Sequence, residues 1–222
     1  MTRRLPRSFF ARDVLEVAPA LLGARLTHAG VTVRVTETEA YAGHLADPGS
    51  HAYRGETPRT APMFGPAGFT YVYFTYGMHW MLCLVTGPAG LAQAVLVRAG
   101  EVVAGHDLAA ARRPGVRPRD WCRGPARLAA SLALTGQHTG LDFCRPSPRA
   151  PTGATTGPGP AGRVALVARG SAQAVERSLI RSGPRVGVSG PGGDGTSYPW
   201  RFWIDGEATV SVFRPGVIRR RG

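Results

Sequence analysis

The sequence predicts one domain of mixed α+β class, in which short helices pack on an antiparallel sheet, and three features support this. Residues 31–41 alternate between two sets of side chains with the period of a strand. Residues 69–86 form two strand-like runs joined by a turn. Residues 13–22 and 125–134 have the apolar content and flanking signals of short helices. We therefore expect hairpin-paired strands with helices packed against them.

The rest of the chain supplies shorter elements. We expect strands at residues 24–27, 93–99, 163–169 and 185–189, a short helix that begins at Thr57-Pro58-Arg59, a weakly helical segment at 103–113, and a hairpin of residues 201–204 and 208–213 about Asp205-Gly206. Residues 1–8 form a basic arm that we expect to be frayed. We expect residues 145–162 to form a Pro/Gly-rich surface loop and residues 214–222 to form a basic tail. All 222 residues are assigned to one domain.

The charge of the chain narrows the class of its partner. The formal net charge is +13 at pH 7, and all 27 basic residues are arginines because the sequence contains no lysine. Such an excess suits a polyanion, which is either a nucleic acid or an anionic membrane surface. No apolar run approaches the roughly 20 residues of a membrane span, and no signal-type apolar core follows the basic N-terminus. We therefore expect a soluble cytoplasmic protein.

The cysteines and histidines do not form a metal-binding pattern. Cys83, Cys122 and Cys144 are too far apart in sequence for a C-x-x-C pair, and their odd number argues against a disulfide framework. The six histidines lack a spacing such as H-E-x-x-H. We expect neither a metal nor any other cofactor.

Carboxylates at the end of the 31–41 strand form the first candidate site. By alternation, one face of this strand carries Val31, Val33, Val35, Glu37, Glu39 and Tyr41. A partly buried carboxylate is costly unless it is paired or used in chemistry. The alternative is a strand end whose glutamates emerge into solvent.

The hairpin that follows is dense in aromatic residues. One of its faces carries Phe69, Tyr71 and Tyr73, and the other carries Val72, Phe74 and Tyr76. An aromatic face at strand spacing is usually part of a core, and this interpretation suits Phe69 and Phe74. Tyr76 is different because it lies beside the turn residue Gly77, so we expect it at the tip of the hairpin.

Several motifs in order along the chain are shared with one family. They are Thr36-Glu37-Thr38-Glu39-Ala40-Tyr41, Thr57-Pro58-Arg59, Tyr71-Val72-Tyr73, Tyr76-Gly77-Met78, Leu96-Val97-Arg98-Ala99, Cys122-Arg123-Gly124-Pro125, Arg185-Val186-Gly187-Val188 and Pro199-Trp200-Arg201-Phe202. Each motif alone is weak, but their order and spacing are specific. From residue 11 to residue 213, the chain resembles the alkyladenine (3-methyladenine) DNA glycosylase family, which includes the mammalian methylpurine glycosylases and their bacterial relatives.

The resemblance implies a fold and an activity. The fold would be a curved antiparallel sheet with short helices and a protruding hairpin that enters the minor groove of DNA. The activity would be that of a monofunctional glycosylase, without lyase activity, which flips 3-methyladenine or 7-methylguanine out of duplex DNA and hydrolyses the N-glycosidic bond. Its partner would be duplex DNA that contains damaged purines, bound by a monomer.

The resemblance also implies which residues carry out the reaction. Glu39 would be the general base that activates a water molecule, and Arg98 would help to hold that water. Glu37 points the same way by alternation, but its equivalent in the family is not the base. We therefore assign Glu37 a structural role.

A second set of residues would receive the base. Tyr41, His51 and Tyr73 match the walls of the base pocket, and Tyr76 matches the residue that fills the vacated stack. Cys83 departs from the family, which commonly has asparagine seven residues after the intercalating tyrosine. Cysteine is smaller than asparagine and a weaker hydrogen-bonding group, so we expect weaker exclusion of guanine-type bases.

A third set of residues would contact the DNA backbone. The resemblance and the residue types suggest Arg59, Gly124, Arg185 and Gly187, because arginine pairs with phosphate and glycine permits close approach. The basic segment 112–119 is either a phosphate-contacting loop or a solvated linker.

Two other functional classes remain as alternatives. A nucleic-acid-binding or remodelling protein could keep this fold without catalysis, although the presence of Glu39, Tyr41, Tyr76 and Arg98 favours an enzyme. A basic RNA-binding module is the third class, but the sequence lacks an RNP or KH signature.

Overall fold

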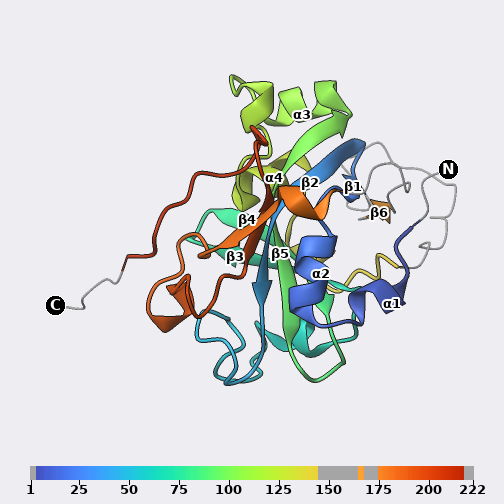
Figure 1. The fold of residues 1–222 in the computed structure, drawn as a ribbon. Helices are drawn as coiled ribbons and strands as arrows, with labels where there is room; N and C mark the ends of the chain where they lie inside the picture. Colours follow the sequence, from blue (N-terminus) through green and yellow to red (C-terminus); the bar gives the residue numbers. More distant parts are fainter. Residues whose placement is uncertain (1–3, 145–164, 168–174, 218–222) are drawn as a thin grey trace, which may run out of the picture.

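The computed structural model describes residues 4–144, 165–167 and 175–217, which are arranged as shown in Figure 1. Within these residues the strands form one eight-stranded sheet with antiparallel pairing. The strand order is β3-β4-β5-β2-β1-β6, while β8 pairs with β2 and β7 pairs with β8. The predicted α+β class with an antiparallel sheet is confirmed.

The elements are short apart from two long central strands. The strands are β1 (Arg25–His28), β2 (Val31–Tyr41), β3 (Thr70–Thr75), β4 (His79–Thr86), β5 (Gln93–Ala104), β6 (Ala165–Val167), β7 (Ile180–Gly183) and β8 (Arg201–Ile204). The α-helices are α1 (Arg7–Phe10), α2 (Val14–Ala20), α3 (His106–Arg112) and α4 (Pro125–Ser131). Single 3₁₀ turns occur at η1 (Ala61–Phe64), η2 (Pro118–Asp120), η3 (Gly136–His138), η5 (Arg177–Leu179) and η6 (Pro191–Gly193). No helix in the described part of the chain has the length and apolar content to cross a membrane.

The main core lies where α2 and α4 pack on the sheet. Helix α2 contacts β2 and β5, and α4 contacts β4 and β5. Their side chains Val17 and Leu128 are fully buried in one apolar cluster with the sheet residue Leu84. Helix α2 begins as predicted, because the Asp13 side chain accepts a hydrogen bond of 2.8 Å from a backbone N–H of the first turn.

Strand β2 organises the sheet because three strands pair with it. Strand β5 pairs along one edge. The other edge is shared between β1, which pairs with residues 31–34, and β8, which pairs with residues 37–39. The second half of β2 is thus held on both edges, which fixes the backbone that carries the two glutamates.

A β-bulge in β2 changes which side chains share a face. Val35 and Glu37 pair with Gly100 and Ala99, which are neighbours in β5, so Thr36 has no partner there. An extra residue of this kind turns the side chains that follow it to the opposite face of the sheet.

The prediction that the valines, glutamates and tyrosine of β2 share one face is therefore wrong. Val31, Val33 and Val35 are buried in the main core together with Ala40, which has the opposite parity. Tyr41 instead packs against a second, smaller apolar cluster formed by β3, β4 and β5. The bulge thus separates the residues that build the core from those that build a site.

Three predicted boundaries are corrected near the middle of the chain. Strand β5 continues to Ala104 because the long β2 supplies partners up to Thr32, so the start of the predicted 103–113 helix is strand. The helix predicted at Thr57 begins later, as the 3₁₀ turn η1. Helix α4 begins at Pro125 as predicted but ends at Ser131, before the predicted end.

Two predicted strands near the C-terminus are absent from the described residues. Both edges of β8 are occupied, by β2 and by β7, so residues 208–213 have no edge of β8 to pair with. They begin in a turn, closed by a 3.2 Å hydrogen bond from the Val210 N–H to the Glu207 carbonyl, and continue without regular structure. Residues 185–189 form no strand, since the Val186 N–H bonds to the Glu39 side chain and the Gly187 N–H bonds to the Arg214 carbonyl.

The basic arm is anchored from residue 4 onward, contrary to the prediction that it is frayed. The Arg7 guanidinium donates to Asp142 at 2.6 Å and to the Ala67 carbonyl, and Arg4 donates to the Phe143 carbonyl at 3.3 Å. The predicted strand at 163–169 is described only as β6. The predicted 145–162 loop and residues 218–222 of the tail lie outside the described residues.

Candidate active site

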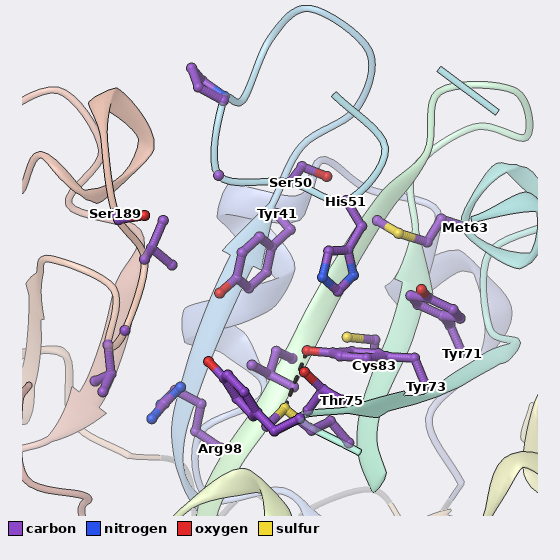
Figure 2. A pocket seen from close by; sticks show the side chains of 18 residues that line it. Tyr41, Ser50, His51, Met63, Tyr71, Tyr73, Thr75, Cys83, Arg98 and Ser189 are labelled. Carbon is purple, nitrogen blue, oxygen red and sulfur yellow. Dashed lines mark hydrogen bonds between the residues drawn. The ribbon is translucent and has the colours of Figure 1, made fainter. Parts of the chain in front are cut away.

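A cavity of about 310 Å³ lies at the end of β2, which is the size range of small-ligand pockets (Figure 2). It is bounded by the 48–51 loop, the β3–β4 hairpin and the 186–189 segment. The lining residues are Tyr41, Pro48, Gly49, Ser50, His51, Met63, Tyr71, Tyr73, Thr75, Tyr76, Met81, Cys83, Leu96, Arg98, Val186, Gly187, Val188 and Ser189. The structure therefore brings together residues from four distant parts of the sequence.

Aromatic rings form two walls of this cavity. Figure 2 shows Tyr41 on one side and the rings of His51 and Tyr73 on the other. The His51 and Tyr73 rings meet edge to face with centroids 4.8 Å apart, and Tyr73 stacks on Tyr71 at 5.2 Å. Burial, reinforced by the charge of Glu39, raises the pKa of Tyr41 and Tyr73 well above the ordinary value, so both remain neutral phenols.

The Glu39 carboxylate is fully buried and is not itself a lining residue, but it is hydrogen-bonded to three residues that line the cavity. Its Oε1 accepts a 2.7 Å hydrogen bond from the Val186 N–H. Its Oε2 accepts hydrogen bonds from the Tyr41 hydroxyl at 2.9 Å and from the Arg98 guanidinium at 3.1 Å. All three donors come from residues that line the cavity. A carboxylate offers about four lone-pair sites, so this geometry leaves one for a further donor such as water.

Arg98 reaches both glutamates from an irregular position in β5. Its backbone neighbours Val97 and Ala99 pair with consecutive β2 residues, which leaves Arg98 without a partner in β2. Its Nε donates to Glu37 Oε1 at 3.0 Å and its Nη1 to Glu39 Oε2. Burial lowers the pKa of Arg98, but the two carboxylates more than offset this, so the guanidinium stays charged.

Glu37 is also fully buried, and it accepts four hydrogen bonds, none of them from a residue of the aromatic walls. Its Oε1 accepts from Arg201 at 2.7 Å, from Arg98 at 3.0 Å and from the Ser211 hydroxyl at 2.8 Å. Its Oε2 accepts from the Ser211 N–H at 2.7 Å. Two carboxylates are thus balanced by two guanidinium groups, as a buried charge cluster requires. This geometry suits the structural role expected for Glu37.

Tyr76 projects from the tip of the β3–β4 hairpin. Its side chain is 76% exposed, and the turn is closed by a 3.2 Å hydrogen bond from the Met78 N–H to the Thr75 carbonyl. Tyr76 and Gly77 have φ of 53° and 68°, the pattern of the turns that join twisted hairpins. Positive φ is unusual for a bulky residue. The turn thus places an exposed aromatic ring at the rim of the cavity.

A protein-family model matches most of the chain, in agreement with the motifs and the geometry of the site. A model of the family described as "Methylpurine-DNA glycosylase" matches residues 8–208. The chain belongs to the methylpurine-DNA glycosylase family. The resemblance drawn from the sequence motifs is thereby confirmed.

Relatives in this glycosylase family are similar along nearly their whole length. A protein of Frankia casuarinae is 50% identical over 211 residues, which cover 93% of this chain and 92% of the relative. A protein of Streptomyces avermitilis is 48% identical, and the match covers 98% of this chain and 95% of the relative. A protein of Burkholderia lata is 44% identical, and the match covers 98% of this chain and 93% of the relative. All three carry the name "Putative 3-methyladenine DNA glycosylase".

Cys83, where this glycosylase-family chain departs from the expected asparagine, forms part of the cavity floor. It is buried and pairs across the hairpin with Tyr71. Burial, with a smaller contribution from Glu39, raises the pKa of the thiol. The thiol therefore remains uncharged and presents only a weak hydrogen-bonding group to the cavity.

The residues predicted to contact the DNA backbone differ in their exposure in the glycosylase fold. Arg59 is exposed, and its guanidinium lies 5.8 Å from the centre of the Tyr73 ring. Gly187 is exposed at the cavity rim with φ of 73°, and Gly124 precedes α4 with φ of 120°. The roles of these three residues stay predictions. Arg185 is corrected: it is 99% buried, with its Nη atoms bonded inside the protein, and so is not available to a phosphate.

Sequence reasoning missed the residues that hold the two glutamates in place. Arg201 and Ser211 reach Glu37 from 164 and 174 residues further along the chain, and Asp47 pairs with Arg185 from 138 residues away. Residue type and spacing carry no signal for such pairs. Within the described residues, no three His, Cys, Asp or Glu side chains gather in a way that could hold a metal ion.

Proposed function

We propose that this protein is a monofunctional DNA glycosylase of base excision repair that removes alkylated purines, with 3-methyladenine and 7-methylguanine as its principal substrates. One observation carries the proposal: a buried carboxylate, Glu39, accepts hydrogen bonds from three residues that line a cavity with facing aromatic walls. The family match and the names of the relatives support the same activity. The product is free base and an abasic site in the DNA.

Base flipping supplies the substrate to this cavity. The glycosidic bond of a stacked base is inaccessible, so the nucleotide must rotate out of the duplex. The exposed Tyr76 ring at the hairpin tip enters the minor groove and fills the space that the base leaves. Its aromatic face compensates for part of the lost stacking.

The aromatic walls select damaged bases by charge. A purine alkylated at N3 or N7 carries a positive charge in DNA, whereas a normal purine does not. Stacking such a cation between Tyr41 and the pair His51 and Tyr73 contributes about 0.5–2 kcal/mol. Alkylation also makes the base a good leaving group, so little acid catalysis is needed.

Hydrolysis then requires one activated water. The water donates a hydrogen bond to the free lone pair of Glu39 and lies beside Arg98. As the C1′–N bond breaks, its electron pair leaves with the purine and neutralises the cationic ring. The water oxygen bonds to C1′, and its proton passes to Glu39. The carboxylate also stabilises the oxocarbenium-like sugar during this step.

The test is release of free base from alkylated duplex DNA. Glu39→Gln should slow the release of 3-methyladenine by about 10²- to 10⁴-fold while binding to the lesion-containing duplex is retained. Glu16→Gln is the matched control, because this side chain is 62% exposed on α2. Wild-type protein that binds the duplex but releases no base would indicate a binding protein without catalysis. Near-parental release by Glu39→Gln would remove Glu39 from the mechanism.

A further inference from the structure

Arg185 donates four hydrogen bonds behind the cavity, all from its two Nη atoms, while its buried Nε has no partner among the described residues. Its Nη1 donates to Asp47 Oδ2 at 2.6 Å and to the Ala40 carbonyl at 2.9 Å. Its Nη2 donates to Asp47 Oδ1 at 2.6 Å and to the Gly192 carbonyl at 2.8 Å. The side chains of Arg185 and Asp47 have no exposed surface. This two-point pairing is the geometry in which arginine and carboxylate bind most strongly and most directionally.

The same guanidinium lies among three aromatic rings. Its central carbon is 4.6 Å from the centre of the Tyr41 ring, 5.3 Å from that of Trp200 and 5.7 Å from that of Tyr198. Tyr41 lines the cavity, whereas Arg185 is not among the lining residues. The cation therefore supports Tyr41 from behind, while the ring presents itself to the cavity.

The ion pair also ties together the backbone segments that surround the reacting groups. Arg185 reaches the end of β2 through Ala40 and the 47–49 turn through Asp47, and the next residue donates to Glu39. Two glycines make room for this junction. A Cβ on Gly49 would lie 2.5 Å from Arg185 Nη2, and a Cβ on Gly192 would lie 2.3 Å from the Gly49 nitrogen.

We propose that Arg185 and Asp47 form a positioning clamp that fixes the Tyr41 ring and the Val186 N–H relative to Glu39, and that Asp47 keeps the Tyr41 face attractive to a cationic base. This inference rests on the proposed function. An unbalanced guanidinium behind Tyr41 would repel a cation stacked on the other side of that ring. Asp47 cancels this charge, so the clamp supplies rigidity without opposing the substrate.

The charge effect is tested with Asp47→Asn. Affinity is measured for duplexes that contain either 7-methylguanine, which is cationic, or hypoxanthine, which is neutral, in the Glu39→Gln background so that neither base is released. The parent should prefer the cationic lesion. Asp47→Asn should reduce this preference about 2- to 30-fold, which corresponds to the range of a cation–π contact. An unchanged preference, or a parent without one, would overturn the proposal.

The double substitution Arg185→Gln/Asp47→Asn separates charge from positioning. It removes both charges and leaves two amides that can pair, so it avoids the uncompensated buried charge that destabilises single variants. When Glu39 is present, the double variant should release base at least tenfold more slowly than the parent. In the Glu39→Gln background, the double variant should keep the parental preference for the cationic lesion. If the double variant releases base at the parental rate, the proposed clamp is wrong. If Asp47→Asn does not fold, the double variant alone tests the clamp.

The matched control is Arg7→Gln/Asp142→Asn, an ion pair of the same length that is not part of the cavity lining. It should leave both the release rate and the lesion preference unchanged. A parent protein that releases no base would contradict the proposed function, but the affinity ratio would still test the clamp. The two failures are therefore distinguishable.

Discussion

The Tyr41 hydroxyl donates a 2.9 Å hydrogen bond to Oε2 of Glu39, two residues earlier in β2. The two side chains lie on one face of the strand because side chains alternate in a strand and the bulge at Thr36 precedes both. One tyrosine therefore serves as a wall of the cavity with its ring and orients the carboxylate with its hydroxyl.

Tyr41→Phe should separate these two contributions. It keeps the ring but removes one donor from the buried carboxylate, and hydrogen bonds to charged groups contribute about 1.5–3 kcal/mol. We expect the single-turnover rate of base release to fall about 10- to 100-fold with little change in lesion-DNA affinity. Tyr73→Phe is the control, because that hydroxyl bonds only to the Met81 sulfur among the described residues, at 3.3 Å. Equal rates for the two variants would contradict the orienting role.

His51 should make the reaction sensitive to acid. Desolvation against the pocket wall lowers the pKa of His51, and the charge of Arg59 lowers it further. The ring is therefore neutral at neutral pH and stays so until the pH falls below the ordinary value of about 6.5. Protonation then places a cation beside a cationic base. Release of 7-methylguanine should accordingly decline below that pH.

Arg59→Gln tests the cause of this shift. Removing the neighbouring charge should raise the pKa of His51 toward its ordinary value, so the decline in 7-methylguanine release should begin at higher pH. The measurement is the pH profile of single-turnover release for the parent and the variant. His51→Gln, which cannot titrate, should flatten the acidic limb, and an acidic limb that survives this change would assign it to another group.

Cys83→Asn should change the choice between charged and neutral lesions. The buried thiol is a weak hydrogen-bonding group, whereas an amide could bond to the edge of a purine and crowd the amino group of guanine. A net hydrogen bond of about 0.5–1.5 kcal/mol should raise hypoxanthine release relative to 7-methylguanine about 2- to 10-fold. Cys83→Ala removes the thiol without adding an amide and should leave this ratio unchanged. If the asparagine variant also keeps the parental ratio, Cys83 does not set specificity.

No strand cleavage should follow base release. Bifunctional glycosylases form a Schiff base between an amine and the sugar. This sequence contains no lysine, and an arginine guanidinium remains protonated and is a poor nucleophile. Treatment with borohydride during the reaction should therefore trap no covalent protein–DNA adduct. A trapped adduct would refute the monofunctional mechanism.

Features that depend on neighbours in the sequence were predictable. Alternation located β2, the Tyr76-Gly77 pair located the hairpin tip, and a capping residue located the start of α2. The order of the motifs identified the family before any contact was known. The resemblance also named the cavity residues Tyr41, His51 and Tyr73, and it pointed to Cys83 as the position that departs from the family.

What the sequence alone determined is therefore the class of fold, the family and the residue types of the site. The tertiary structure decided which residues face the cavity and which support it. The bulge at Thr36 turned Glu37, Glu39 and Tyr41 away from the face that the valines share, because the pairing with the partner strand interrupts the alternation. Arg185 is buried and paired with Asp47, 138 residues away, and so is not exposed to a phosphate. Such pairings arise only when distant segments pack, and no local pattern of residues encodes them.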